Sequence, residues 1–125
     1  METTRLALIA AGLLGGGVAL VHGGVIQRLM VRPIGARLSE ARTSNSVRRL
    51  VPVLLQFSTW NWFVCGLALI AAGYGLGSEA RTAIAVLVGS SYLFAAVGNF
   101  WATRGRHPGW VLYSITVGLI IYAVW

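Results

Sequence analysis

Residues 6–27 read LALIAAGLLGGGVALVHGGVIQ, a run of 22 residues without a charged side chain between Arg5 and Arg28. A helix of about 20 mostly apolar residues is long enough to cross the hydrocarbon core of a bilayer. Inside that core the backbone polar groups must bond within the segment, which a helix achieves and an isolated strand does not. The run therefore predicts a transmembrane helix at the start of the chain.

The same pattern returns three times along the 125 residues. Uncharged runs of 29, 22 and 19 residues occupy positions 50–78, 82–103 and 107–125. We therefore predict an all-α fold, a single transmembrane domain over residues 1–125 with a charged loop at about 28–49. Its four transmembrane helices are expected at about residues 6–27, 50–74, 82–102 and 110–125.

The composition supports a membrane protein and excludes a soluble domain. Hydrophobic residues make up 57% of the chain and charged residues 10%, whereas about a quarter of an ordinary globular domain is charged. Cys65 is the single cysteine, so neither a disulfide framework nor a paired thiolate site is predicted.

The arginines predict the orientation. Eight of the ten basic residues fall in the first and third loops, at Arg28, Arg32, Arg37, Arg42, Arg48, Arg49, Arg104 and Arg106. Loops rich in Arg stay in the cytoplasm, so both termini are expected outside, in a multi-pass protein of the bacterial inner membrane. The formal net charge of +7 is then a topology signal. No aromatic-and-basic motif points to nucleic acid.

Prolines and capping residues predict where helices end. Pro33 is expected to break the chain after the first helix, and Ser44 offers a capping oxygen before the second. Pro52 is expected within a first turn, and Pro108 is placed to open the last helix. The segment 34–42 is expected to form one or two amphipathic turns on the membrane surface.

Small residues gather on one side of the first helix. At 100° per residue, a face about a third of the circumference wide holds Gly12, Gly15, Gly16, Ala19 and Gly23. Small faces let helix backbones approach closely in lipid. We expect this face to pack against another helix or another chain. His22 shares the face, where it is either satisfied by a neighbouring helix or available to a ligand.

The second helix carries polar side chains on two opposite sides. Ser58, Asn61 and Cys65 share one face, and Gln56 and Thr59 lie on the other. This helix is therefore expected at the centre of the bundle, or between the bundle and a partner chain.

Polar residues concentrate in the cytoplasmic half of the expected spans. Candidates for a ligand-binding vestibule are His22, Gln56, Asn61, Asn99 and His107. Candidates for binding an anion or a lipid head group are Arg28, Arg32, Arg48, Arg49, Arg104 and Arg106. The alternative is that the polar groups bond between helices and the arginines only fix the topology.

Several kinds of chemistry lack their usual residues. The spans contain no carboxylate and no lysine, the common marks of ion-coupled pumps. No close-spaced ligand pair supports a metal site, and no base stands beside Cys65 in sequence. We expect no metal and no cofactor, and whether the protein is an enzyme stays open, with the residues favouring a non-catalytic role.

Three features are similar to those of small bacterial four-span membrane proteins. These are the His22-Gly23 end of the first helix, the Trp-rich second helix and the segment Thr103-Arg-Gly-Arg-His-Pro-Gly-Trp110. The resemblance covers most of the chain and implies fold and topology, without an activity. Those proteins often carry a Trp-His pair in the second helix where this chain has Leu55-Gln56, and this departure weakens a histidine-based function.

Three functions follow as expectations. The first is a non-catalytic accessory or scaffolding subunit that contacts a partner membrane protein, a second copy or specific lipids of the bilayer. The second is a small oligomeric carrier or channel for an anionic or amphipathic solute. The third is a membrane enzyme or redox subunit that acts on a hydrophobic substrate with His22, Asn99 and His107.

Overall fold

The computed structural model describes residues 2–41 and 43–125, so Arg42 of the expected first loop lies outside the described residues. The described residues form helices joined by short turns, which confirms the predicted all-α fold. In chain order these are α1 (Glu2–Ile26), the π-helical turn η1 (Gln27–Val31), α2 (Arg32–Glu40), α3 (Asn45–Gly75), α4 (Ser78–Thr103) and α5 (Gly109–Val124).

The first helix does not end at Pro33 as predicted. α1, η1 and α2 form one continuous helix of 39 residues, Glu2–Glu40. A proline in a helix lacks its N–H and its ring clashes with the carbonyl four residues earlier. The π-helical turn widens the chain just before Pro33, and the Arg32 N–H bonds to the Gln27 carbonyl. The helix therefore continues past the proline, and most of the expected loop 28–49 is helical.

The second long helix begins earlier than predicted. Ser44 caps it as expected, because its hydroxyl accepts from the Val47 N–H at 3.3 Å. The helix starts at Asn45, so Pro52 lies inside it and not in its first turn. Pro108 does stand at the N-cap of α5, as predicted.

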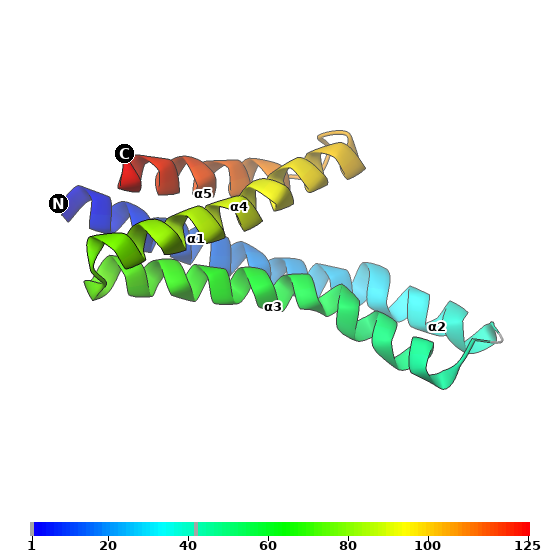
Figure 1. Ribbon diagram of the computed structural model, residues 1–125. Helices are drawn as coiled ribbons and strands as arrows, with labels where there is room; N and C mark the ends of the chain where they lie inside the picture. The colour runs from blue at the N-terminus through cyan, green and yellow to red at the C-terminus, as the bar shows by residue number, and fades with distance from the viewer. Residues whose placement is uncertain (1, 42) are drawn as a thin grey trace.

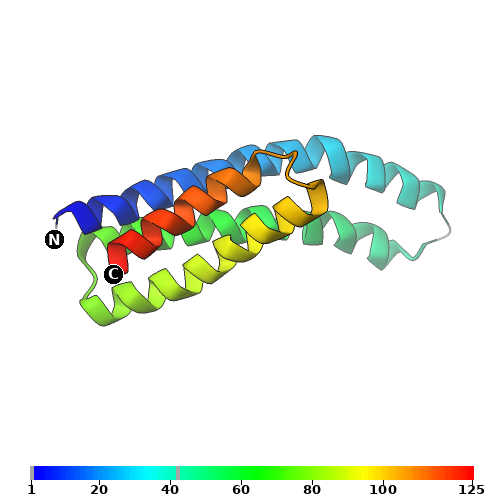
Figure 2. The same ribbon diagram turned by 90° about the horizontal axis from the view of Figure 1, so that it is seen from above.

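The helices run alternately up and down (Figures 1 and 2). The chain termini and the α3–α4 turn lie at one end, and the α4–α5 turn lies towards the other. Beyond the α4–α5 turn, α2 and the first part of α3 continue as a pair (Figure 1). We call residues 27–56 the helical hairpin.

Three of the continuous helices are long and apolar enough to cross a membrane, namely Glu2–Glu40, α3 and α4. α5 has 16 residues, and at about 1.5 Å per residue it is shorter than the hydrocarbon core of about 30 Å.

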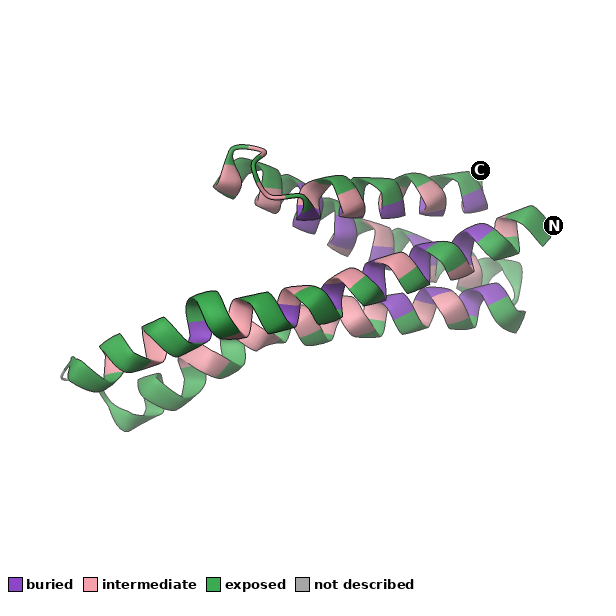
Figure 3. Ribbon diagram, turned by 180° about the vertical axis from the view of Figure 1, so that it is seen from behind, coloured by how far each residue is buried: buried purple, intermediate pink, exposed green. Residues whose placement is uncertain are grey.

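α1 and α3 make the most extensive helix–helix contact of the bundle, and each also packs against one further helix. α1 packs along α3 and also against α5, and Tyr92 of α4 lies beside Gly15. Figure 3 shows buried residues concentrated where the four helices meet, while the hairpin is mostly exposed or intermediate. Both helices also turn one side outward, with Leu13 and Val21 exposed on α1 and Phe57 and Trp60 exposed on α3.

Glycines on both partners bring α1 and α3 into backbone contact. A Cβ on Gly12 would lie 2.5 Å from the Gly66 carbonyl oxygen, and a Cβ on Gly66 would lie 2.7 Å from the Gly12 carbonyl oxygen. Neither position has room for a side chain, and close approach of this kind is how helices associate in lipid. The glycine face of α1 thus makes contacts within the chain.

Candidate ligand cavity

A cavity of about 460 Å³ lies between α1 and the α4–α5 end of the bundle. This is within the range of about 300–1,000 Å³ common for small-molecule sites. Most of its wall is apolar, formed by Leu13, Leu14, Val18, Val21, Val25 and Leu112. The cavity is partly open, and several wall residues, including Leu13 and Val21, are themselves exposed.

Four side chains with polar atoms join this apolar wall. They are His22 from α1, Asn99 from α4, His107 from the α4–α5 turn and Tyr113 from α5. Three of them were predicted as ligand residues from the sequence, and the fold brings these three to one cavity. No charged side chain is among the described residues that line it.

Gly17 makes room for the cavity on α1. It is one of the lining residues, and nothing lies within 4 Å of the position that its Cβ would take. A side chain at residue 17 would therefore grow into the cavity and not into a neighbouring helix. Gly24, on the same helix, also has nothing within 4 Å and does not line the cavity.

The α4–α5 turn holds His107 in place. Arg104 and Gly105 adopt left-handed backbone conformations that end α4, and the His107 N–H bonds to the Thr103 hydroxyl at 3.3 Å. The Gly109 N–H donates to His107 Nδ1 at 3.0 Å. An Nδ1 that accepts carries no proton, so the ring proton lies on Nε2. His107 is therefore fixed as an Nε2–H donor.

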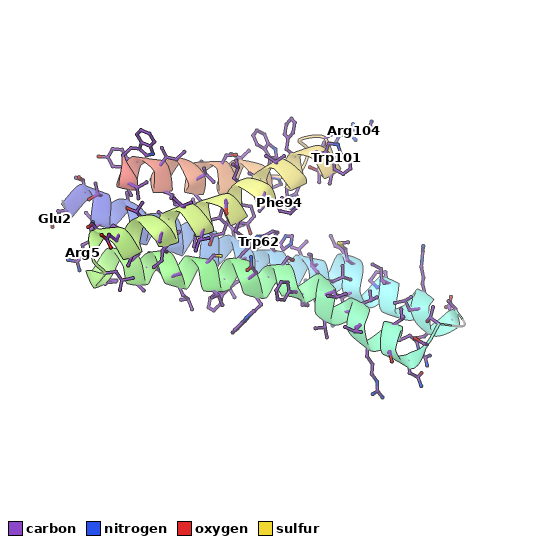
Figure 4. The ribbon with its side chains drawn as sticks, in the orientation of Figure 1. Glu2, Arg5, Trp62, Phe94, Trp101 and Arg104 are labelled. Atoms are coloured by element: carbon purple, nitrogen blue, oxygen red, sulfur yellow. The ribbon has the colours of Figure 1, made fainter. Side chains whose placement is uncertain are left out.

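An aromatic cluster contains one ring from each of α1, α3, α4 and α5. The His22 ring lies 4.9 Å from Trp62 of α3, Trp62 lies 5.0 Å from Tyr113, and Tyr113 stacks on Tyr92 of α4 at 5.3 Å. Figure 4 shows Trp62 about midway along α3, beside the other helices. Contacts within the cluster hold the rings of two cavity residues, His22 and Tyr113, in place.

The two tyrosines of the cluster differ in their hydroxyl groups. Tyr92 donates an interhelical hydrogen bond to the Trp62 carbonyl at 2.8 Å. Tyr113 is 1% exposed, and its hydroxyl has no hydrogen-bond partner among the described residues. A buried tyrosine hydroxyl normally finds a partner, so the free hydroxyl of Tyr113 is an exception that needs an explanation.

Asn99 makes its hydrogen bond within its own helix. Its Nδ2 donates to the Ala95 carbonyl at 2.8 Å, so this bond lies within α4 and is not the interhelical bond considered for Asn99. The neighbouring backbone is tied down as well, because the Thr103 hydroxyl donates to the Asn99 carbonyl at 2.6 Å.

The other two vestibule candidates lie elsewhere. Gln56 bonds to Gln27 at 2.9 Å and to the Gly23 carbonyl at 3.3 Å, joining α3 to the helix opposite. Asn61 donates to the Ser91 hydroxyl at 3.1 Å between α3 and α4. Both side chains connect helices and stand outside the cavity lining.

The arginine candidates divide into two places. Arg28, Arg32, Arg48 and Arg49 lie on the helical hairpin, all exposed. Arg104 lies at the end of α4 close to Trp101, as Figure 4 shows, and Arg106 follows in the turn. This turn contributes His107 to the cavity lining, but neither arginine lines the cavity.

A metal would find few ligands in the described part of the chain. No three His, Cys, Asp or Glu side chains come together there. The cavity instead offers two imidazoles, an amide and a phenol at the edge of an apolar space. Such a wall suits a molecule with a long apolar part and a small polar head.

Sequence reasoning missed Tyr113, Gly17 and Gly109 as parts of this site. The burial of Tyr113 and the missing partner of its hydroxyl both depend on which groups the other helices bring near. A Cβ on Gly109 would lie 2.8 Å from His107 Nδ1, and this crowding also appears only in three dimensions.

No family model, curated protein or solved structure matches this chain.

Proposed function

We propose that this protein is a non-catalytic integral membrane subunit that binds one specific amphipathic molecule taken from the bilayer. The observation that carries the proposal is the cavity itself, which joins an apolar wall to four side chains with polar atoms. Bulk lipid would need only an apolar surface. A cavity with hydrogen-bonding groups at one place selects among amphipathic molecules by their heads.

The setting of the cavity supports uptake from the membrane. Its wall is built from helices that are apolar enough to span a bilayer, together with the shorter α5. Exposed lining residues such as Leu13 and Val21 connect the cavity to the outer surface of the bundle. In a membrane that surface faces lipid, so an amphipathic molecule reaches the site without crossing water.

Native mass spectrometry of Gly17→Leu and Gly24→Leu tests this proposal. Both changes add the same side chain to α1 at positions without a neighbour within 4 Å, but only residue 17 lines the cavity. Wild type and both variants are extracted from the host membrane in polymer discs, without detergent. We expect one bound species at fixed stoichiometry in wild type and Gly24→Leu, and its loss in Gly17→Leu.

Two outcomes would refute the proposal. One is the same set of bound lipids in all three proteins. The other is a wild-type chain that carries no small molecule while it remains folded.

A second function, contact with a partner membrane protein, is supported by the helical hairpin. The hairpin continues beyond the α4–α5 turn (Figure 1), and it exposes apolar side chains, with Leu29 71%, Leu54 64% and Val53 63% accessible. At about 1.5 Å per residue, α1 alone already covers the hydrocarbon core. Part of this apolar surface would then project beyond lipid, and large exposed apolar patches mark interaction sites.

Site-specific photocrosslinking tests the second function. A photoreactive residue replaces Leu50 on the hairpin, which is 53% exposed, or Val86 on α4, which is 63% exposed. A discrete protein adduct at position 50 and not at position 86 is the expected result. Lipid adducts alone at both positions would contradict it.

A further inference from the structure

We propose that a second pocket, at the end of the bundle that carries the chain termini, binds a phosphate group between Arg5 and Arg81. A lipid head group and inorganic phosphate both offer this chemistry. The pocket lies at the opposite end of the bundle from the α4–α5 turn, which contributes to the candidate ligand cavity (Figure 1). The inference therefore does not depend on the proposed function.

The pocket lies where α1, the end of α3 and the start of α4 come together. Its volume is about 360 Å³, and its described lining consists of Glu2, Arg5, Gly73, Tyr74, Gly75 and Arg81. Figure 4 shows Glu2 and Arg5 near each other at this end of the bundle. A Cβ on Gly73 would lie 3.2 Å from the Arg5 carbonyl oxygen, so this glycine lets α1 lie against the end of α3 at Arg5.

Contacts with neighbouring residues place both guanidinium groups at the pocket. The guanidinium carbon of Arg5 lies 5.1 Å from the centroid of the Tyr74 ring, a cation–π contact between two lining residues. Nη2 of Arg81 donates to the carbonyl of Leu76, the residue after Gly75, at 3.5 Å. Nε of Arg81 is enclosed and has no partner in the described part of the chain. The donors that remain for a ligand are therefore on the terminal nitrogens, because a guanidinium has five N–H groups.

The pocket has an excess of positive charge. Glu2 lines it too, but within the described part of the chain neither Arg5 nor Arg81 forms an ion pair with a carboxylate. Two arginines and one glutamate leave one positive charge without a counter-charge, and a phosphodiester carries one negative charge. Guanidinium groups bind phosphate oxygens through charge-assisted hydrogen bonds. The lining therefore favours a phosphate over an uncharged head group.

The position of the pocket along the helices favours a lipid as the source of the phosphate. Arg5 directly precedes the uncharged run 6–27, and Arg81 directly precedes the run 82–103. In a membrane, charged residues at the ends of such runs lie at the boundary between hydrocarbon and water, where the lipid phosphates are. Tyr74 is 63% exposed beside Arg5, and tyrosine is enriched at this boundary.

Ligand-induced stabilisation in dodecyl maltoside tests the inference, because this detergent contains no phosphate. The probes are dihexanoyl phosphatidylglycerol, dihexanoylglycerol, which has the same acyl chains without the phosphate, and inorganic phosphate. Dissociation constants come from the dependence of the melting temperature on probe concentration. Cooperative melting without probe shows that each variant is folded.

Two kinds of variant are compared, each with a matched control. Arg5→Gln and Arg81→Gln remove a charge from the pocket, and Arg37→Gln removes the same charge from the exposed surface of the helical hairpin. Gly75→Leu and Gly77→Leu add the same side chain at positions where a Cβ has no atom within 4 Å, but only Gly75 lines the pocket.

We expect wild type to bind phosphatidylglycerol at least about tenfold more tightly than dihexanoylglycerol. Arg5→Gln and Arg81→Gln should each weaken this binding by at least about tenfold, the size of one hydrogen bond to a charged group. Gly75→Leu should abolish it. Arg37→Gln, Gly77→Leu and Gly17→Leu, which fills the other cavity, should bind as wild type does. Tighter binding of phosphatidylglycerol than of inorganic phosphate assigns a lipid source, and equal affinity assigns inorganic phosphate.

Three outcomes would overturn the inference. One is an equal loss of affinity in Arg81→Gln and Arg37→Gln, which would mean attraction to net charge alone. Another is equal binding of phosphatidylglycerol and dihexanoylglycerol, and the third is a wild-type chain that no phosphate probe stabilises. Each would leave the proposed function standing, because the bound mass in native discs and the Gly17→Leu variant test the other cavity.

Discussion

The two ends of this molecule are equally helical but are held together very differently. In the half that contains α4 and α5, the helices meet through glycine backbones and an aromatic cluster. In this cluster His22 packs on Trp62, Trp62 on Tyr113, and Tyr113 on Tyr92. In the helical hairpin, Val31 is the one buried residue among the described positions of 27–56. Helix formation alone therefore does not decide where a stable site can form. Close packing does, and it occurs where small residues and aromatic rings face one another.

The largest effect is expected from a change at Gly66, where α3 meets α1 in the packed half. Gly66→Leu should lower the free energy of unfolding by at least about 2 kcal/mol, because its side chain would collide with backbone atoms of Gly12 and Gly16 that cannot move aside. The measurement is unfolding in mixed micelles with increasing dodecyl sulfate. Gly24→Leu is the control, since its Cβ meets no atom within 4 Å. Equal losses in the two variants would mean that the helices do not meet at Gly66.

A smaller effect separates the two stacked tyrosines. Tyr92→Phe removes the hydrogen bond to the Trp62 carbonyl and should cost about 0.6–1.7 kcal/mol of unfolding free energy, as measured for interhelical bonds in membranes. Tyr113→Phe removes a hydroxyl that has no partner in the described part of the chain and should cost nothing in the ligand-free protein. Unfolding of the two variants side by side in ligand-free micelles measures the difference. If Tyr113→Phe lost as much unfolding free energy as Tyr92→Phe, the Tyr113 hydroxyl would have to make a hydrogen bond.

The smallest expected effect lies in the helical hairpin. Pro52 stands inside α3, where a proline leaves the carbonyl four residues earlier without its donor. Pro52→Ala restores that bond, so amide hydrogen exchange of residues 45–56 should slow. The global unfolding midpoint should change by less than about 0.5 kcal/mol, because the hairpin contributes little to the packed half. Unchanged exchange in 45–56, or a large shift of the midpoint, would show that the two regions are not separate.

The same contrast explains what could be predicted from the sequence. The uncharged runs predicted the all-α fold, because helix length and hydrophobicity are local properties. The helix end predicted at Pro33 was wrong, since a π-helical turn of five residues just before the proline lets the helix continue past it. The Gln27–Gln56 bond and the crowding at Gly66 depend on the register between helices, which no single-helix pattern contains.

The candidate site was predicted in part for similar reasons. His22, Asn99 and His107 stood out as polar residues in apolar surroundings, and they do line one cavity. Gln56 and Asn61 stood out equally but bond to neighbouring helices. Their separation from the other three depends on which face of α3 meets which helix. The prediction placed α3 at the centre of the bundle or between the bundle and a partner chain. In the structure α3 packs against α1 and α4 and exposes its other side.

The most direct test of the account is to label the cavity wall from inside. A diazirine analogue of leucine is placed at Leu112, which lines the cavity, or at Leu87 on α4, which is 70% exposed and does not. Native membranes are irradiated, and the mass of each chain is measured. The account predicts one discrete small-molecule adduct at position 112 and a mixture of bulk lipids at position 87. The same lipid mixture at both positions would contradict it.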